Sequence, residues 1–155
     1  WPQDTQSCRL PSGARLSYAR LGRSKEAGQV WVLFHGTPGS RLDYTLEHEY
    51  AEKHSIRIIS IDRPGYGYSS LHDRGMLGFM QDVEHVLDYC GVQEFAVLGV
   101  SGGGPYTLAA AYHFPKSRLR KAAIVCGTPH PQFQKSSVSI QGRIYRWFHG
   151  WAPWI

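Results

Sequence analysis

The sequence predicts an α/β protein with a largely parallel sheet, and two features of the chain carry that prediction. Apolar segments with the length of strands alternate along the chain with segments of helical periodicity. The apolar segments are continuous rather than alternating, as expected for strands covered on both faces. They span residues 30–34, 56–61, 95–98 and 119–126. Because strands and helices alternate, we expect parallel strands joined by helical crossovers.

Local patterns predict the other elements. Residues 7–21 are typical of two short strands joined by a turn that contains proline and glycine. Helices are predicted over residues 42–53, 77–91 and 108–113. In the first of these helices Leu42, Leu46 and Tyr50 are spaced four apart, which predicts that they share a face.

Composition and charge narrow the functional classes. The chain has 155 residues, of which 42% are hydrophobic, enough for one domain with a buried core. The net charge of +5 is scattered along the chain. The densest basic run, residues 116–121, lies where a helix end favours cations, so no nucleic-acid partner is expected. Three distant cysteines show no metal-binding spacing, so no metal or cofactor is predicted.

The chain contains no apolar segment of the roughly 20 residues that span a membrane. It shows no signal peptide either, so we expect a cytoplasmic protein without a membrane partner. The sequence assigns no oligomeric state. Its last 17 residues, 139–155, carry an aromatic helical face that we interpret as a covering helix, with partner docking and membrane-surface binding as alternatives. That face consists of Ile140, Ile144, Trp147, Phe148 and Trp151.

A glycine-flanked serine follows the apolar segment 95–98. Residues 99–103, Gly-Val-Ser-Gly-Gly, match the pattern G-x-S-x-G between a predicted strand and a predicted helix. In that context the pattern places the Ser101 hydroxyl at the carboxyl end of the sheet, with the Gly102 amide and the helix N-terminus facing the same point. An ordinary glycine-rich strand-to-helix turn is the alternative interpretation.

Two further loops rich in turn residues also follow predicted strands. They are His35-Gly-Thr-Pro-Gly-Ser40 and Asp62-Arg-Pro-Gly-Tyr-Gly-Tyr-Ser69. The carboxyl ends of parallel strands meet at one edge of a sheet, where open α/β sheets bind ligands. We therefore expect both loops to lie beside the serine turn.

With these motifs the chain resembles the α/β-hydrolase superfamily, in its lid-bearing serine hydrolase form. The resemblance extends from about residue 10 to residue 131 and rests on segments 13–18, 35–38, 62–69 and 99–105. It implies a three-layer αβα sandwich with a mostly parallel sheet whose C-terminal strands are missing from this sequence. It also implies that residues 1–131 form the N-terminal part of the hydrolase core and residues 132–155 the start of a lid.

The resemblance implies a role for several individual residues. Ser101 is similar to the nucleophile, and the amides of Gly102 and Thr37 resemble the two oxyanion-hole donors. His35 and Gly36 resemble the supporting loop, and Asp62 resembles a packing residue rather than a catalytic acid. These roles imply hydrolysis of an ester, thioester or related acyl bond in a small-molecule substrate through an acyl-enzyme.

The sequence departs from the family where the catalytic acid and base are expected. In this fold both follow the nucleophile along the chain, yet no Asp or Glu follows Ser101. The histidines that do follow it, His113, His130 and His149, do not resemble the family's catalytic histidine. The sequence alone therefore leads us to expect a truncated and poorly active fragment with an exposed sheet edge at residues 119–126.

Other functions remain open at this stage. A non-catalytic α/β-hydrolase-like binding protein would keep the pocket without the triad. An acyltransferase or a carbon–carbon bond hydrolase would use the same serine with a different pocket and acceptor. Relatives with an aspartate nucleophile open epoxides or cleave carbon–halogen bonds, but serine at position 101 favours acyl transfer.

Overall fold

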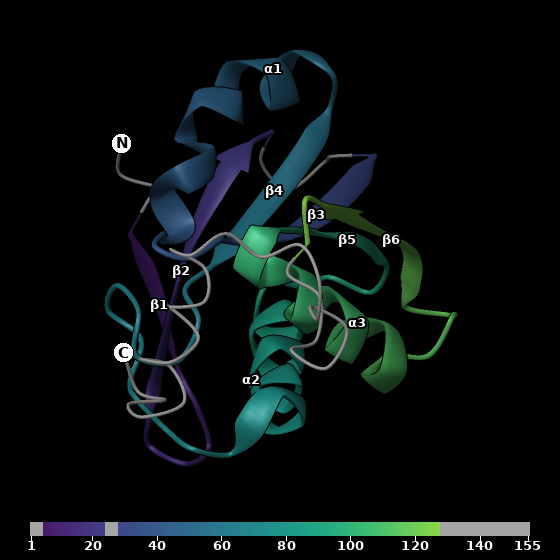
Figure 1. The fold of residues 1–155 in the computed structure, drawn as a ribbon. Coiled ribbons are helices and arrows are strands. Elements are labelled where there is room, and N and C mark those ends of the chain that lie inside the picture. Colours follow the sequence, from purple (N-terminus) through teal and green to yellow (C-terminus); the bar gives the residue numbers. More distant parts are fainter. Residues whose placement is uncertain (1–4, 24–27, 128–155) are drawn as a thin grey trace, which may run out of the picture.

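The computed structural model describes residues 5–23 and 28–127, which form one six-stranded sheet with helices on both faces (Figure 1). The strands are β1 (Gln6–Arg9), β2 (Arg15–Gly22), β3 (Gln29–Phe34), β4 (Ile56–Ile61), β5 (Phe95–Val100) and β6 (Leu119–Val125). The helices are η1 (Arg41–Glu47), α1 (His48–Lys53), α2 (Gly75–Tyr89), η2 (Ser101–Gly103) and α3 (Gly104–His113), of which η1 and η2 are 3₁₀ helices.

The strand order is β1-β2-β4-β3-β5-β6, and most of the pairings are parallel. Strand β3 pairs in parallel with β4 and β5, and β5 pairs in parallel with β6. The β1–β2 and β2–β4 pairings are antiparallel, and the predicted turn joins β1 to β2. The predicted α/β class and largely parallel sheet are confirmed.

The helices form the two outer layers of the sandwich. Successive residues of β3 point to opposite faces, so Leu33 packs with one core and Val32 and Phe34 with the other. The core around Leu33 lies under η1 and α1 and includes Tyr44 and Ala51. The larger core lies under α2 and α3, which pack side by side on the other face of the sheet (Figure 1).

Helix α2 contributes the largest buried apolar face. Its Phe79, Val83, Val86 and Leu87 side chains are fully buried. The Phe79 ring lies 6.0 Å from that of Phe34. This face explains why the periodicity of residues 77–91 predicts a helix correctly.

The segment 42–53 differs from its prediction. It begins as the 3₁₀ helix η1, with a kink at Tyr44, and only then continues as α1. A 3₁₀ helix has about three residues per turn, so a spacing of four does not align side chains along it. Leu46 is 91% and Tyr50 63% exposed, whereas Arg41 and Tyr44 are buried in their place. The segment is helical as predicted, but Leu42, Leu46 and Tyr50 do not form a buried apolar face.

Helix α3 begins four residues before its predicted start. Glycine is a poor helix former, so helix propensity alone does not predict that the helix begins at Gly104. Pro105 occupies its first turn, where a missing N–H costs nothing. The helix thus starts immediately behind Ser101 and η2.

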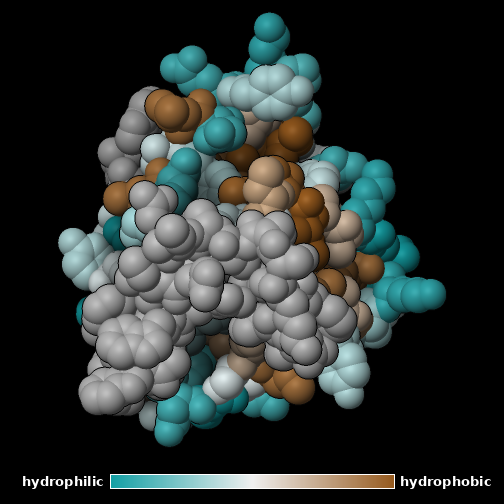
Figure 2. Space-filling view, viewed as in Figure 1, coloured by the Kyte–Doolittle hydropathy of each residue, from teal (hydrophilic) through white to brown (hydrophobic). Residues whose placement is uncertain are grey.

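Strand β6 forms one edge of the described sheet, and the apolar side chains at its carboxyl end are only partly covered. Ile124 is 43% and Val125 46% exposed. Figure 2 shows apolar atoms gathered on this side of the molecule, over β5 and β6. An exposed edge at this strand was expected from the sequence. No helix within residues 5–23 and 28–127 is long and apolar enough to cross a membrane.

Replacing Phe79 with alanine tests the larger core. The Phe79→Ala change removes a fully buried ring and should lower the free energy of unfolding by about 3–5 kcal/mol. Tyr89, 69% exposed on the same helix, supplies the control, because Tyr89→Ala should change it by less than about 0.5 kcal/mol. Urea unfolding followed by circular dichroism measures both, and equal losses would contradict this description of the core.

Candidate active site

Strand register brings three loops to one edge of the sheet. Phe34, the last residue of β3, lies opposite Ile61 at the end of β4 and opposite Gly99 near the end of β5. The loops that begin at residues 35, 62 and 101 therefore start side by side. The predicted clustering of the three loops at the carboxyl edge is thus observed.

The serine turn has the backbone that its glycines predict. Ser101 has a φ of 50°, in the left-handed region that a non-glycine residue rarely adopts. A Cβ on Gly103 would overlap the Phe34 carbonyl oxygen, and one on Gly99 would overlap the Gly103 carbonyl oxygen. Glycine is required at both positions because backbone packs directly against backbone. The turn leaves Ser101 half-buried at the first residue of η2, just before α3.

The loop after β3 packs against the serine turn. A Cβ on Gly36 would lie 4.0 Å from Ser101 Oγ. A Cβ on Gly102 would lie 3.4 Å from the Thr37 nitrogen and 2.7 Å from its Oγ1. Ser101 and the two residues predicted to donate to an oxyanion, Thr37 and Gly102, therefore meet in one small region.

His35 is completely buried beneath this region, and both of its ring nitrogens are engaged. Its Nδ1 lies 2.8 Å from the Gly36 carbonyl oxygen, and its Nε2 accepts a hydrogen bond of 3.2 Å from the Arg63 backbone N–H. Since a carbonyl only accepts, Nδ1 carries the proton and the ring is neutral. Burial lowers the pKa of His35, and the charge of Arg63 acts in the same direction. These contacts support a structural function for His35 in shaping the loop.

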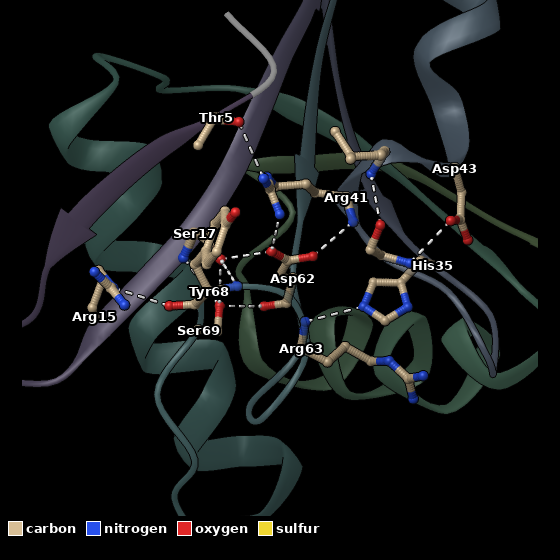
Figure 3. A network of polar contacts seen from close by, with 12 residues as sticks. Thr5, Arg15, Ser17, His35, Arg41, Asp43, Asp62, Arg63, Tyr68 and Ser69 are labelled. Carbon is tan, nitrogen blue, oxygen red and sulfur yellow. Dashed lines mark hydrogen bonds and ion pairs between the residues drawn. The ribbon is translucent and has the colours of Figure 1, made fainter.

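Asp62 is a fully buried carboxylate that holds the second loop in place (Figure 3). It accepts hydrogen bonds from the Arg41 backbone N–H at 2.7 Å, from Arg41 Nη1 at 2.8 Å and from Ser17 Oγ at 2.6 Å. A Cβ on Gly67 would overlap this carboxylate, which explains the glycine in the turn. These bonds occupy both carboxylate oxygens and favour the packing function expected for Asp62.

Arg63 is a buried residue at this edge whose contacts the sequence does not predict. It is 6% exposed, and its Nη2 donates to the Gly36 carbonyl at 2.8 Å and to Thr37 Oγ1 at 2.6 Å. Its guanidinium lies 4.5 Å from the ring centre of Tyr66 and 5.2 Å from that of Tyr106. The sequence indicates only a tight turn at this arginine, because nothing in the local pattern shows which loop it contacts.

None of the three histidines that follow Ser101 in the sequence is placed beside it in the described part of the chain. His113 ends α3 and bonds to Glu84 through Nε2 at 3.3 Å. A ten-residue helix is about 15 Å long, which separates His113 from the serine turn that precedes the helix. His130 and His149 lie outside the described residues, as does the segment predicted to begin a lid. No described residue forms a hydrogen bond with the Ser101 hydroxyl.

A comparison with protein families identifies the fold. The family model described as alpha/beta hydrolase fold matches residues 30–154. The chain belongs to this family. The three-layer α/β-hydrolase sandwich inferred from the resemblance is confirmed for the described part of the chain.

Individual relatives give a consistent result. The chain is 30% identical over 104 residues to the bifunctional esterase/perhydrolase of Acinetobacter calcoaceticus. The match covers 64% of this chain and 37% of that protein. It is 33% identical over 98 residues to the 2-hydroxymuconate semialdehyde hydrolase of Pseudomonas putida, across 61% of this chain and 34% of that protein. The chain thus matches about a third of the length of these curated relatives.

A solved structure shows the same fold at lower identity. An epoxide hydrolase superposes with a TM-score of 0.72 at 21% identity, covering 96% of this chain and 52% of that one.

Close backbone packing at Gly103 is testable by adding one methyl group. Gly103→Ala forces a Cβ against the Phe34 carbonyl and should destabilise the fold by about 3 kcal/mol, the upper part of the range for overpacking. Gly28→Ala is the control, because its Cβ meets nothing within 4 Å. Thermal unfolding of both variants measures the difference, and a Gly103→Ala protein as stable as Gly28→Ala would refute the packing argument.

Acidification should weaken the fold through His35. The folded pKa lies below the usual 6.5, so below about pH 6.5 the unfolded chain binds a proton that the folded chain does not. The stabilising contribution is therefore complete above pH 6.5 and is lost as the pH falls through the lowered pKa. Urea unfolding at pH 7.5 and 5.5 should show a larger loss of stability in the wild type than in His35→Asn, whose amide donates to Gly36 without titrating. Equal losses in the two proteins would contradict this assignment.

Proposed function

We propose that this protein is a serine hydrolase that cleaves an ester, thioester or related acyl bond through an acyl-enzyme on Ser101. The observation that carries the proposal is the left-handed Ser101 turn, packed against the loop that contains Thr37. The Ser101 side chain lies close to the backbone of the loop after β3 and beside Gly102, at the edge where α/β sheets bind ligands.

The reaction begins when Ser101 Oγ attacks the acyl carbon and its proton passes to a general base. The carbonyl oxygen becomes negatively charged and accepts hydrogen bonds from the Thr37 and Gly102 amides. Collapse of this intermediate expels the alcohol or thiol, which takes the proton, and leaves an ester on Ser101. Water then attacks the ester, releases the acid and restores the serine.

Each oxyanion donor contributes about 10²–10³-fold to the rate of such a reaction. The general base lies outside the described residues in this proposal, because His35 engages both ring nitrogens and His113 lies at the far end of α3. The segment 132–155 is proposed to begin a lid over the site. Its aromatic residues would favour an apolar acyl or alcohol group.

Serine at the turn favours acyl chemistry over epoxide opening. The epoxide hydrolase described above shares the fold at 21% identity, and this similarity does not indicate a common substrate. An esterase/perhydrolase is among the curated relatives at 30% identity, which supports ester cleavage. The substrate is therefore proposed to be a small acyl compound.

Removing the nucleophile tests this proposal. In the protein expressed from its complete reading frame, Ser101→Ala should lower hydrolysis of p-nitrophenyl butyrate by at least about 10³-fold, because no acyl-enzyme can form. A fluorophosphonate probe should label the wild type and leave Ser101→Ala unlabelled.

The control is Ser117→Ala, which removes the hydroxyl of an exposed serine just before β6 and should leave hydrolysis and labelling unchanged. A folded wild type that neither hydrolyses the ester nor takes up the probe would favour the non-catalytic binding protein. Hydrolysis that persists in Ser101→Ala would place the chemistry at another residue.

A further inference from the structure

The carbonyl of Gly36 accepts two hydrogen bonds from buried donors. One comes from Arg63 Nη2 and the other from His35 Nδ1, each at 2.8 Å. A carbonyl oxygen has two lone pairs, so this one is fully occupied. The same peptide unit carries the Thr37 N–H. In the proposed function this N–H donates one of the two hydrogen bonds to the oxyanion.

Holding the oxygen of this peptide also fixes the direction of its N–H. A peptide unit is planar, so the C=O and N–H bonds cannot turn independently. Arg63 Nη2 holds the next residue as well, through its hydrogen bond to Thr37 Oγ1 at 2.6 Å. The other terminal nitrogen of Arg63 points to the Gly102 carbonyl at 3.5 Å, the outer limit of a hydrogen bond. One guanidinium therefore contacts both backbone segments that flank Ser101.

The positive charge of Arg63 strengthens its hydrogen bond to the Gly36 carbonyl. Hydrogen bonds from an ionised donor are about twice as strong as neutral ones. A bond to the carbonyl also polarises the peptide, strengthening hydrogen bonds made by its N–H by about 10–30% per bond. A charged donor on the Gly36 carbonyl therefore makes the N–H of the same peptide a stronger hydrogen-bond donor.

No described carboxylate neutralises Arg63. Its neighbour Asp62 is occupied by Arg41 and Ser17. The remaining partners of the Arg63 guanidinium are carbonyls, a hydroxyl and the two tyrosine rings, and its Nε has no hydrogen-bond partner. Buried charges are normally paired, and an unpaired one is costly. A cation kept at this position favours negative charge developing beside it.

We propose that Arg63 is a positioning residue for acyl transfer: it orients and polarises the Gly36–Thr37 peptide so that the Thr37 amide stabilises the oxyanion. The inference rests on the proposed function of Ser101. A purely structural Arg63 would join the two loops and affect stability alone. The two cases differ because only the positioning function predicts a fall in kcat.

The test compares kinetic constants for p-nitrophenyl butyrate in the complete protein. Arg63→Gln should lower kcat by about 10–100-fold, less than the loss of a direct oxyanion donor, with KM changed less than about threefold. Arg63→Lys keeps the charge and should recover part of that loss. A trifluoromethyl ketone, which forms a tetrahedral adduct with the serine, should bind Arg63→Gln more weakly in proportion to the fall in kcat.

Arg57 supplies a matched control. It is also a buried arginine that donates to a backbone carbonyl, that of Cys90 at 3.0 Å, but it lies at the amino end of β4. Arg57→Gln should lower the melting temperature and leave kcat unchanged. If folded Arg63→Gln keeps the wild-type kcat, or loses activity only to the extent that Arg57→Gln does, the inference is overturned.

A spectroscopic measurement covers the case in which Arg63→Gln does not fold. The Thr37 amide proton should move upfield in the NMR spectrum of Arg63→Lys, because its peptide is less polarised, and an unchanged shift would count against the inference. Activity that persists in Ser101→Ala overturns the proposed function and this inference with it. An inactive Ser101→Ala protein together with an unaffected Arg63→Gln overturns the inference alone.

Discussion

The buried carboxylate of Asp62 is the interaction on which the carboxyl edge of this sheet depends. A charge removed from water is tolerated only where hydrogen bonds and an opposite charge replace the solvent. Here Ser17 of β2 and Arg41 of η1 supply them from two different elements. The loop after β4 is thereby tied both to the antiparallel part of the sheet and to the helix behind the loop after β3. Each of these loops has its shape because the other is present.

This network also decides what Arg63 can do. Arg63 follows Asp62 in the sequence, but the ion-pair partner of Asp62 is Arg41. Arg63 instead turns toward Gly36 and Thr37 and lies against Tyr66 and Tyr106. The candidate site is therefore built from two linked layers, a carboxylate that fixes the loops and a guanidinium that reaches the backbone beside Ser101.

Most of the fold could be predicted because the patterns that specify its strands and turns lie within short segments of the sequence. Continuous apolar segments identify the parallel strands, and the glycines around Ser101 identify a turn in which backbone packs on backbone. What could not be predicted depends on long-range pairing. The burial of Arg41 in place of Leu42 follows from Asp62, 21 residues away, and no periodicity within 42–53 reveals it. The contacts of Arg63 are hidden for the same reason.

The left-handed backbone at Ser101 has a consequence for the chemistry that this turn can support. A β-branched side chain is strongly disfavoured at a positive φ, whereas aspartate and asparagine tolerate it well. Threonine carries the same hydroxyl as serine, yet the turn selects against it. A carboxylate nucleophile would fit the same backbone with little strain. The turn thus disfavours threonine, the closest chemical analogue of serine, and accepts aspartate, whose carboxylate supports a different class of reaction.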